Sequence, residues 1–531
     1  MKTRVHLGAP LIALSLATAT AAWAQTIGKP PEQLGKVSFA NSCAPAAQAS
    51  FERALALLHS FWWQEGEKTF RRVLEEDPTC AIATWGIATI LIGNTFATGP
   101  TPADAQWAKE AIERGRAIGA KTERERLFIE AVAAYYDRFA DRTHGQRIKS
   151  LADAFEIVAK RFPGDDEAQI FYAIYLTATQ QPTDKKFTAA LKAASILEEQ
   201  FKKHPDHPGV AHYLIHAYDY PPIAQKGLTA AKRYSEIAPS APHALHMPSH
   251  IFTRVGAWRE SAVSNERSAA VAKAENEPDA RLHAMDYMVY AYLQLARDGD
   301  ARRVLDEAPR VAGAKPTVRS VPYALAAIPA RYAMERSAWK EAAELQLHAS
   351  RFPFTEAITH FARAIGAARS GDAAAAERDV QELARIVEAL KATKDAYWTV
   401  EVEVQRLSGA AWVAFAKGSR GEALNLMRAA ADLEDKSEKA AVSPARIVPA
   451  RELLGDMLLE SGRPGDALAE YERSQARDPN RYRSLYGAGQ VAALSGNRDK
   501  ARHYFSKLIE FAGSGDLRPE VETARRYLAS N

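Results

Sequence analysis

The sequence predicts an all-α protein built from stacked helical pairs. Apolar residues recur with the 3.6-residue period of amphipathic helices, and residues that favour helices are abundant. No sustained run alternates apolar and polar residues as a half-buried strand does. A small residue, an aromatic or apolar residue and a proline also recur in one frame, in places every 34 residues. That period is typical of repeats made of two helices and a turn.

The clearest repeat has Ala467, Tyr471 and Pro479 in this frame, and a shift of 34 residues leads to Ala501 and Phe505. The small residue lets two helices approach, the aromatic ring fills the gap beside it, and the proline ends the second helix. Earlier copies of the frame use Gly66, Phe70 and Pro78; Leu151, Phe155 and Pro163; Ala193, Leu197 and Pro205; Gly227 and Pro239; Ser261; Ala301 and Leu305. Around Ala342, Ala376 and Ala423 the spacing is looser.

This frame resembles that of the tetratricopeptide-repeat (TPR) family. The resemblance implies a helix-turn-helix solenoid that winds into a right-handed superhelix, with about eleven helical pairs in this chain. It also implies that the first helix of each pair lines a concave groove.

We expect one elongated array, because each repeat of a solenoid contacts only its neighbours. The expected divisions are a signal peptide over 1–24, an N-terminal extension over 25–46, a TPR array with a histidine cluster over 47–315, irregular TPR-like helical pairs over 316–447, a C-terminal TPR pair over 448–515 and a capping segment over 516–531.

The first 24 residues have the features of a secretory signal peptide. Lys2 and Arg4 precede an apolar run, and Ala22-Trp23-Ala24 supplies the small residues of a cleavage site. Cleavage after Ala24 predicts a periplasmic or secreted protein. No later stretch reaches the roughly 18 apolar residues that a membrane span needs, so we expect none.

The formal charge of the chain bears on the class of partner that it binds. Removal of Lys2 and Arg4 lowers the formal charge from +4 to +2, and no basic block follows, so we expect no nucleic-acid partner.

Cys43 and Cys80 are the only cysteines, and an even number in an exported chain favours a disulfide. That bond would attach the N-terminal extension to the first helical pair. Two buried thiols are the alternative.

Histidines are concentrated in one part of the chain. Eight of the fourteen lie between residues 204 and 283. They include two pairs with i,i+4 spacing, His212 with His216 and His246 with His250, which places both rings of a pair on one helix face. The pairs are 34 residues apart, so they occupy the same phase of consecutive repeats.

Neighbouring packed helices lie about 8 to 10 Å apart, so we expect the four imidazoles to converge on one point. In the TPR family these positions of the first helix face a ligand. His243 adds a fifth ring, and His283 and Asp286 stand at the corresponding offsets of the next repeat. Carboxylates bind a metal or orient a ligating ring. The predicted metal site therefore contains His212, His216, His243, His246, His250, His283, Asp286 and Asp219.

Neutral imidazole is a common ligand of zinc and also suits copper and nickel. No thiolate or methionine cluster is present to favour Cu(I), so the prediction is zinc or copper(II). Two other interpretations of the histidines stay open, a groove for a peptide or a small polar ligand and a structural hydrogen-bond network. Pro248 lies between His246 and His250 and predicts a kink that aims the rings.

A second resemblance is to a group of exported bacterial TPR proteins that carry a His-Met-Pro-Ser-His-Ile signature. It rests on residues 246–252, 212–216, 57–62 and 282–287 of this chain. The resemblance implies the fold and the place of the site, and no reaction.

The sequence thus predicts a periplasmic TPR protein that binds or delivers a divalent transition metal and holds a protein or peptide in its concave groove. One alternative is a metal-free interaction scaffold. Another is a metal-dependent hydrolase in which Asp219 or Asp286 is the general base for a bound water. No established motif for catalysis, nucleotide binding or haem attachment is found, so the sequence favours a binding protein over an enzyme.

Overall fold

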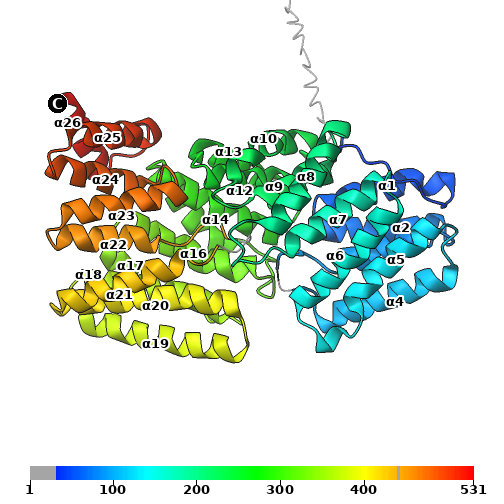
Figure 1. Ribbon diagram of the computed structural model, residues 1–531, viewed down its shortest axis with the longest axis horizontal. Helices are drawn as coiled ribbons and strands as arrows, with labels where there is room; N and C mark the ends of the chain where they lie inside the picture. Colours follow the sequence, from blue (N-terminus) through cyan, green and yellow to red (C-terminus); the bar gives the residue numbers. More distant parts are fainter. Residues whose placement is uncertain (1–30, 98, 439–442, 531) are drawn as a thin grey trace, which may run out of the picture. The chain divides into compact units, whose positions relative to one another are not determined.

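A computed structural model describes residues 31–97, 99–438 and 443–530 (Figure 1). The predicted signal peptide lies outside these residues. The chain divides into residues 1–32 and a second unit, residues 33–531, and every helix of the described residues belongs to the second unit. The described residues contain helices and no strand, which confirms the all-α prediction.

Consecutive helices form hairpins in which each helix packs against the next. The first helices of these hairpins are α1 (Gln48–His59), α3 (Ile82–Ile90), α5 (Glu123–Tyr136), α7 (Asp166–Ala178), α9 (Pro208–Tyr218), α11 with α12 (Pro242–His246 and Pro248–Arg254), α14 (Pro278–Gln294), α16 (Ser320–Glu335), α18 (Pro353–Arg369), α20 (Ala396–Ala416), α22 (Ala450–Glu460) and α24 (Tyr482–Leu494). The second helices are α2 (Trp63–Glu76), α4 (Pro102–Ile118), α6 (His144–Arg161), α8 (Thr188–Lys203), α10 (Leu228–Ile237), α13 (Trp258–Ala274), α15 (Asp298–Glu307), α17 (Trp339–Ala343), α19 (Ala373–Ala392), α21 (Arg420–Glu434), α23 (Pro464–Arg477) and α25 (Arg498–Ala512). A last helix, α26 (Pro519–Ser530), follows them, and short 3-10 helices occupy Pro45–Ala47, Phe139–Asp141, Ala224–Gly227 and Ala308–Arg310.

The repeat frame predicted from the sequence forms the contact inside each hairpin. The small residues Ala467 and Ala501 are fully buried in the second helices α23 and α25. The aromatic position packs on a glycine of the first helix, because a Cβ at Gly455 would lie only 2.8 Å from the Tyr471 ring. The packing follows the TPR-like pattern of helix-turn-helix repeats, as the frame predicts.

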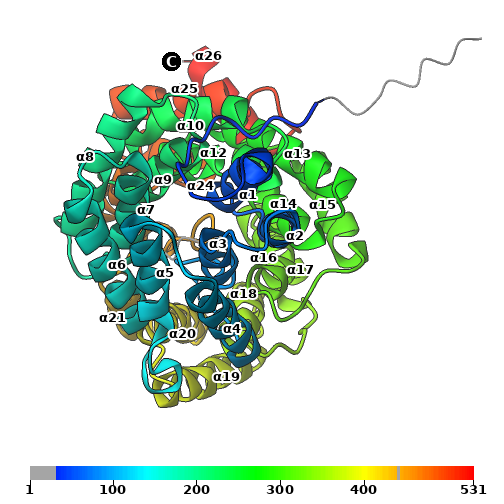
Figure 2. The same ribbon diagram turned by 90° about the vertical axis from the view of Figure 1, so that its right-hand side faces the viewer.

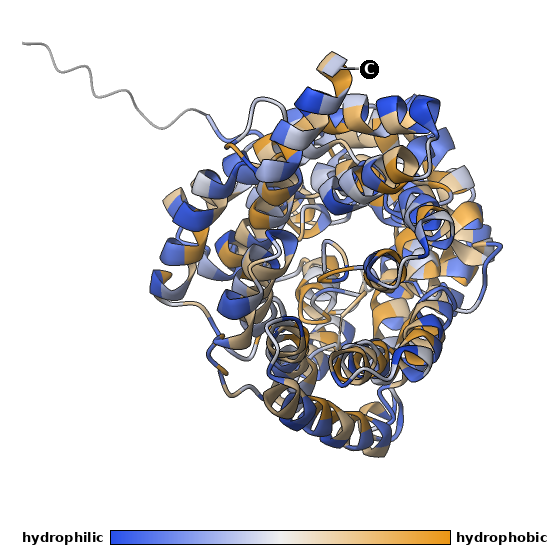
Figure 3. Ribbon diagram, turned by 90° about the vertical axis from the view of Figure 1, so that its left-hand side faces the viewer, coloured by the Kyte–Doolittle hydropathy of each residue, from blue (hydrophilic) through white to orange (hydrophobic). Residues whose placement is uncertain are grey.

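Apolar side chains inside and between the hairpins form the core. Figure 3 shows hydrophilic residues on one side of many helices and hydrophobic residues on the other. One continuous cluster of buried side chains runs from Leu34 to Phe252 and so joins α1 to α12. No helix among the described residues has the length and hydrophobicity that crossing a membrane would require.

Contacts between distant repeats differ from the expected array in which each repeat touches only its neighbours. Trp258 at the start of α13 donates from Nε1 to the carbonyl of Asn480, 2.7 Å away. The guanidinium of Arg481 is fully buried and lies 2.7 Å from the Glu335 carboxylate at the end of α16. Helices from the middle and the end of the chain therefore pack together. A repeat period describes neighbouring hairpins only, so it cannot predict such contacts.

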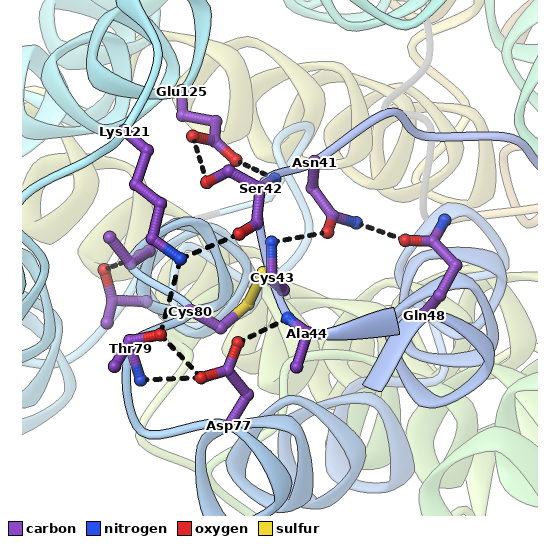
Figure 4. The surroundings of a disulfide bond; sticks show 12 residues. Asn41, Ser42, Cys43, Ala44, Gln48, Asp77, Thr79, Cys80, Lys121 and Glu125 are labelled. Carbon is purple, nitrogen blue, oxygen red and sulfur yellow. Dashed lines mark hydrogen bonds between the residues drawn. A yellow bond between two sulfur atoms is a disulfide. The ribbon is translucent and has the colours of Figure 1, made fainter. Parts of the chain in front are cut away.

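A disulfide holds the N-terminal segment on the first helical pairs (Figure 4). Cys43 and Cys80 are bonded, and their Cα atoms lie 4.6 Å apart. The backbone N–H of Ala44 donates to Asp77 at 2.6 Å, and this bond, with others from Thr79, lowers the pKa of the Asp77 carboxyl. The segment before α1 is thus fixed by covalent and polar contacts.

We expect the Cys43→Ala/Cys80→Ala double variant to lose roughly 4 kcal/mol of unfolding free energy, the loop-entropy value for a cross-link of this span. Urea denaturation of both proteins measures the difference. Reductant should weaken the native protein and leave the double variant unchanged. Equal midpoints for the two oxidised proteins would contradict a stabilising bond.

Candidate metal centre

Three consecutive first helices supply the histidines. Helix α9 packs against α12 (Figure 2), and α11 packs against α14. The break predicted at Pro248 is confirmed, because Met247 separates α11 from α12 and Pro248 occupies the first position of α12. Proline is well suited to that position, where the missing N–H would have no helical partner. The ring nitrogens of His246 on α11 and His250 on α12 still approach each other across this break, at 3.1 Å.

Six histidines gather into two groups of three. Within each group, one ring nitrogen of every residue lies within 4.8 Å of the others. Each group combines an i,i+4 pair from one repeat with a histidine from the start of the next repeat. This arrangement differs from the single convergence point that we expected. The first triad is His212, His216 and His243, and the second triad is His246, His250 and His283.

Hydrogen bonding fixes the tautomer of the central ring in the first triad. His212 Nδ1 lies 2.6 Å from the backbone carbonyl of His59. A carbonyl can only accept, so Nδ1 carries the proton and Nε2 of the neutral ring presents its lone pair. Nε2 is approached by His216 Nε2 at 3.1 Å and by His243 Nε2 at 3.2 Å. One lone pair satisfies one good hydrogen bond, so hydrogen bonding accounts for only one of these two contacts.

Two rings of the second triad are fixed in the same way. His246 Nδ1 donates to Asn265 Oδ1 at 2.7 Å, and Asn265 Nδ2 donates to the Ser261 carbonyl, which identifies the amide oxygen. His250 Nδ1 donates to Asp219 Oδ2 at 2.9 Å. With Nδ1 protonated, the neutral form of each ring presents an Nε2 lone pair, and these two atoms are 3.1 Å apart. A cation or a shared proton can stabilise two ring nitrogens at this distance.

Burial keeps the rings in the form that binds metals. His212, His216, His246 and His250 are buried, and the third ring of each triad is partly exposed. Burial, and then the neighbouring imidazoles, hold the pKa of His212 and of His243 well below 6.5. Metal binding requires neutral imidazole, so these two rings need not lose a proton first.

Aromatic side chains enclose the triads. Phe61 stacks on His243 with ring centroids 5.4 Å apart, and Phe96 stacks on His216 at 4.3 Å. Tyr287 borders the second triad and donates its hydroxyl to His250 Nε2 at 3.2 Å. An apolar surround of this kind limits water access and lowers the local dielectric constant.

The two predicted carboxylates lie in ion pairs outside the triads. Asp219 bonds His250 through one oxygen and accepts from Arg254 Nε at 2.8 Å through the other. It therefore orients a ring. Asp286 is fully buried and lies 3.3 Å from Arg331 Nε. Burial raises the pKa of Asp286 to about 6, although the arginine opposes this shift.

A third cluster, His59, Glu167 and His207, has the residue types of a metal site but a complete hydrogen-bond network. His207 Nδ1 accepts the N–H of Val210, so its Nε2 carries a proton and donates to Glu167 at 3.0 Å. His59 Nε2 lies 3.0 Å from the other Glu167 oxygen, and Tyr213 bonds its Nδ1. Although burial opposes it, the two histidines lower the pKa of Glu167. Each ring nitrogen has a partner, which is the pattern of a structural network.

Sequence reasoning did not include several residues that support the triads. Asn265 lies on the second helix after the His246 pair, and Tyr287 lies one helical turn after His283. Glu167, which sequence reasoning also missed, comes from α7 and belongs to the third cluster and not to a triad. The i,i+4 offset of Tyr287 from His283 is the one signal that could have identified a member of this group.

Comparison with known proteins adds no family. No family model matches the chain, and no curated protein matches it. Among solved structures, a monomeric IFIT1 mutant with Gppp-AAAA is 13% identical with a TM-score of 0.41, over 88% of this chain and 98% of that chain. The human IFIT1 dimer with m7Gppp-AAAA is 13% identical with a TM-score of 0.40, over 77% and 86%. Similarity at this level carries no argument about ligand or function.

Two matched carboxylate-to-amide variants separate the structural cluster from the triads. We expect Glu167→Gln to lower the unfolding free energy by about 1 to 3 kcal/mol, because a buried acceptor of two ring N–H groups is lost. Its metal affinity should stay native. We expect Asp219→Asn to weaken metal binding by about 10- to 100-fold, because the partner that orients His250 changes. Denaturation and metal titration of both variants measure these effects. If Glu167→Gln weakened metal binding and Asp219→Asn did not, the separation of a structural cluster from the metal-binding triads would be contradicted.

Proposed function

We propose that this protein binds transition-metal ions, zinc or copper(II), through the two histidine triads. The observation that carries the proposal is the convergence of Nε2 lone pairs whose Nδ1 atoms are anchored to fixed acceptors. Metal-ligating histidines usually donate their other ring N–H to a carbonyl or a carboxylate in this way.

The distances support this proposal. Ligand nitrogens bound to a tetrahedral ion at 2.0 to 2.1 Å lie about 3.3 to 3.4 Å apart. The Nε2 atoms of the first triad lie 3.1 and 3.2 Å from the central nitrogen, and the anchored pair of the second triad is 3.1 Å apart. Small ring movements would therefore complete the coordination. Three protein ligands also leave one position open, as capture or transfer of an ion requires.

We also propose that the protein is exported. A disulfide between Cys43 and Cys80 suits an oxidising compartment such as the periplasm. The signal peptide, with cleavage after Ala24, and the bacterial signature group remain part of the proposal. A protein or peptide partner that delivers or accepts the ion would approach the partly exposed rings of His243 and His283.

Elemental analysis of residues 25–531 tests metal binding directly. We expect bound zinc or copper in the purified protein and its loss in the His212→Ala/His250→Ala double variant, because that variant removes one anchored ligand from each triad. His503→Ala, an exposed histidine far along the chain, is the matched control and should keep the native metal content.

Helical content and thermal unfolding establish whether the double variant folds. If it does not fold, His283→Ala replaces it, because that ring is partly exposed and belongs to one triad only. Metal content that does not change in a folded variant would defeat the proposal. The metal-free interaction scaffold would then be the better interpretation.

A further inference from the structure

We propose that the two triads form one dinuclear copper centre, which binds dioxygen between its two ions. This inference rests on the proposed function and adds the number of ions, the metal and the ligand that they share.

Two pairs of neighbouring rings connect the first triad with the second triad. The ring centroids of His216 and His250 are 6.1 Å apart, and those of His243 and His246 are 5.9 Å apart. Each of these pairs takes one ring from each triad. Ions in two-metal sites lie about 3.5 to 4 Å apart, and rings this close bring two ions within range of one bridging ligand.

One short helix belongs to both triads. His243 and His246 are both on α11, three residues apart, and each contributes to a different triad. Side chains at this spacing have Cβ atoms roughly 5 to 6 Å apart on one helix face. The two sites therefore cannot move independently, and α11 acts as their common wall.

The charge that two bound ions bring into the site favours one oxidation state of the metal. The six ligands are imidazoles, which supply no negative charge, and among the described residues neither triad includes a carboxylate or a thiolate. Asp219, whose carboxylate accepts from Nδ1 of His250, is also paired with Arg254. Two divalent ions would place four positive charges in a buried site, whereas two Cu(I) ions would place two. Burial of uncompensated charge is costly, so the pair favours Cu(I) at rest. The sequence suggested one site and disfavoured Cu(I) because soft ligands are absent; the charge of two ions in one buried site is the reason to reverse that expectation.

Two Cu(I) ions together hold the two electrons that convert dioxygen to peroxide. Each ion becomes Cu(II), the O–O bond stays intact as a single bond, and the peroxide bridges the ions at the open fourth positions. No other reductant is needed for this single event. The Tyr287 hydroxyl lies 3.2 Å from His250 Nε2 in the second triad, and Phe61 and Phe96 pack on His216 of the first triad, where they limit the access of water.

Copper loading tests the inference. Metal-free protein, residues 25–531, is titrated with Cu(I) without oxygen, desalted, and then exposed to air. We expect two copper ions per chain and a new near-ultraviolet absorption band on exposure to air. The oxidised protein should give no Cu(II) electron paramagnetic resonance (EPR) signal, because the two spins couple. In His283→Ala the copper content should fall from two to one, and the EPR signal of an isolated Cu(II) should appear. His503→Ala should match the native protein.

The outcomes separate this inference from the proposed function. No binding of any metal would overturn both. One ion per chain, or two Cu(II) ions with their full EPR signals, would overturn the dinuclear centre and leave metal binding in place. Cu(I) that air does not oxidise would overturn the dioxygen step, and a zinc pair that copper cannot replace would overturn the choice of metal.

Discussion

The hydrogen bonds at Nδ1 of His212, His246 and His250 determine the rest of the site. Each bond goes outward, to a backbone carbonyl, an amide oxygen or a carboxylate. Because a neutral imidazole has one proton, each outward bond leaves a lone pair that faces inward. The acceptors belong to distant elements, so the fold itself selects the tautomer. Removing these outward bonds would turn the triads into an ordinary network of histidines.

The helical repeat explains why the part of the chain that the structure describes contains two histidine triads and no third. One repeat places histidines at 243, 246 and 250, and the same offsets in the flanking repeats carry Gly209, His212 and His216 before it and His283, Asp286 and Tyr290 after it. A side chain at Gly209 would collide with His59, since a Cβ there would lie 2.3 Å from Nδ1. Asp286 and Tyr290 bond arginines instead. The cluster therefore ends on both sides where neighbouring packing takes over the position.

Much of this arrangement could be predicted from the sequence. The 34-residue frame predicted the helical hairpins, and the i,i+4 spacing predicted that His212 and His216 share a face. The division into two triads could not be predicted, because it depends on how neighbouring first helices pack and turn their rings. The tautomer of each ring could not be predicted either, because it is set by partners such as the His59 carbonyl, 153 residues before His212. Two ion pairs likewise join segments that are far apart in the sequence, and no local sequence pattern predicts them. They are Asp286 with Arg331 and Arg481 with Glu335.

Anomalous diffraction from crystals of the protein grown with copper, collected on both sides of the copper absorption edge, tests the central claim most directly. The account predicts two peaks, one in each triad, with Nε2 of each histidine as the ligand atom about 2.0 to 2.1 Å from the ion. Ligation through Nδ1 of His212 or His250, or a peak between His59, Glu167 and His207 with none in the triads, would contradict it.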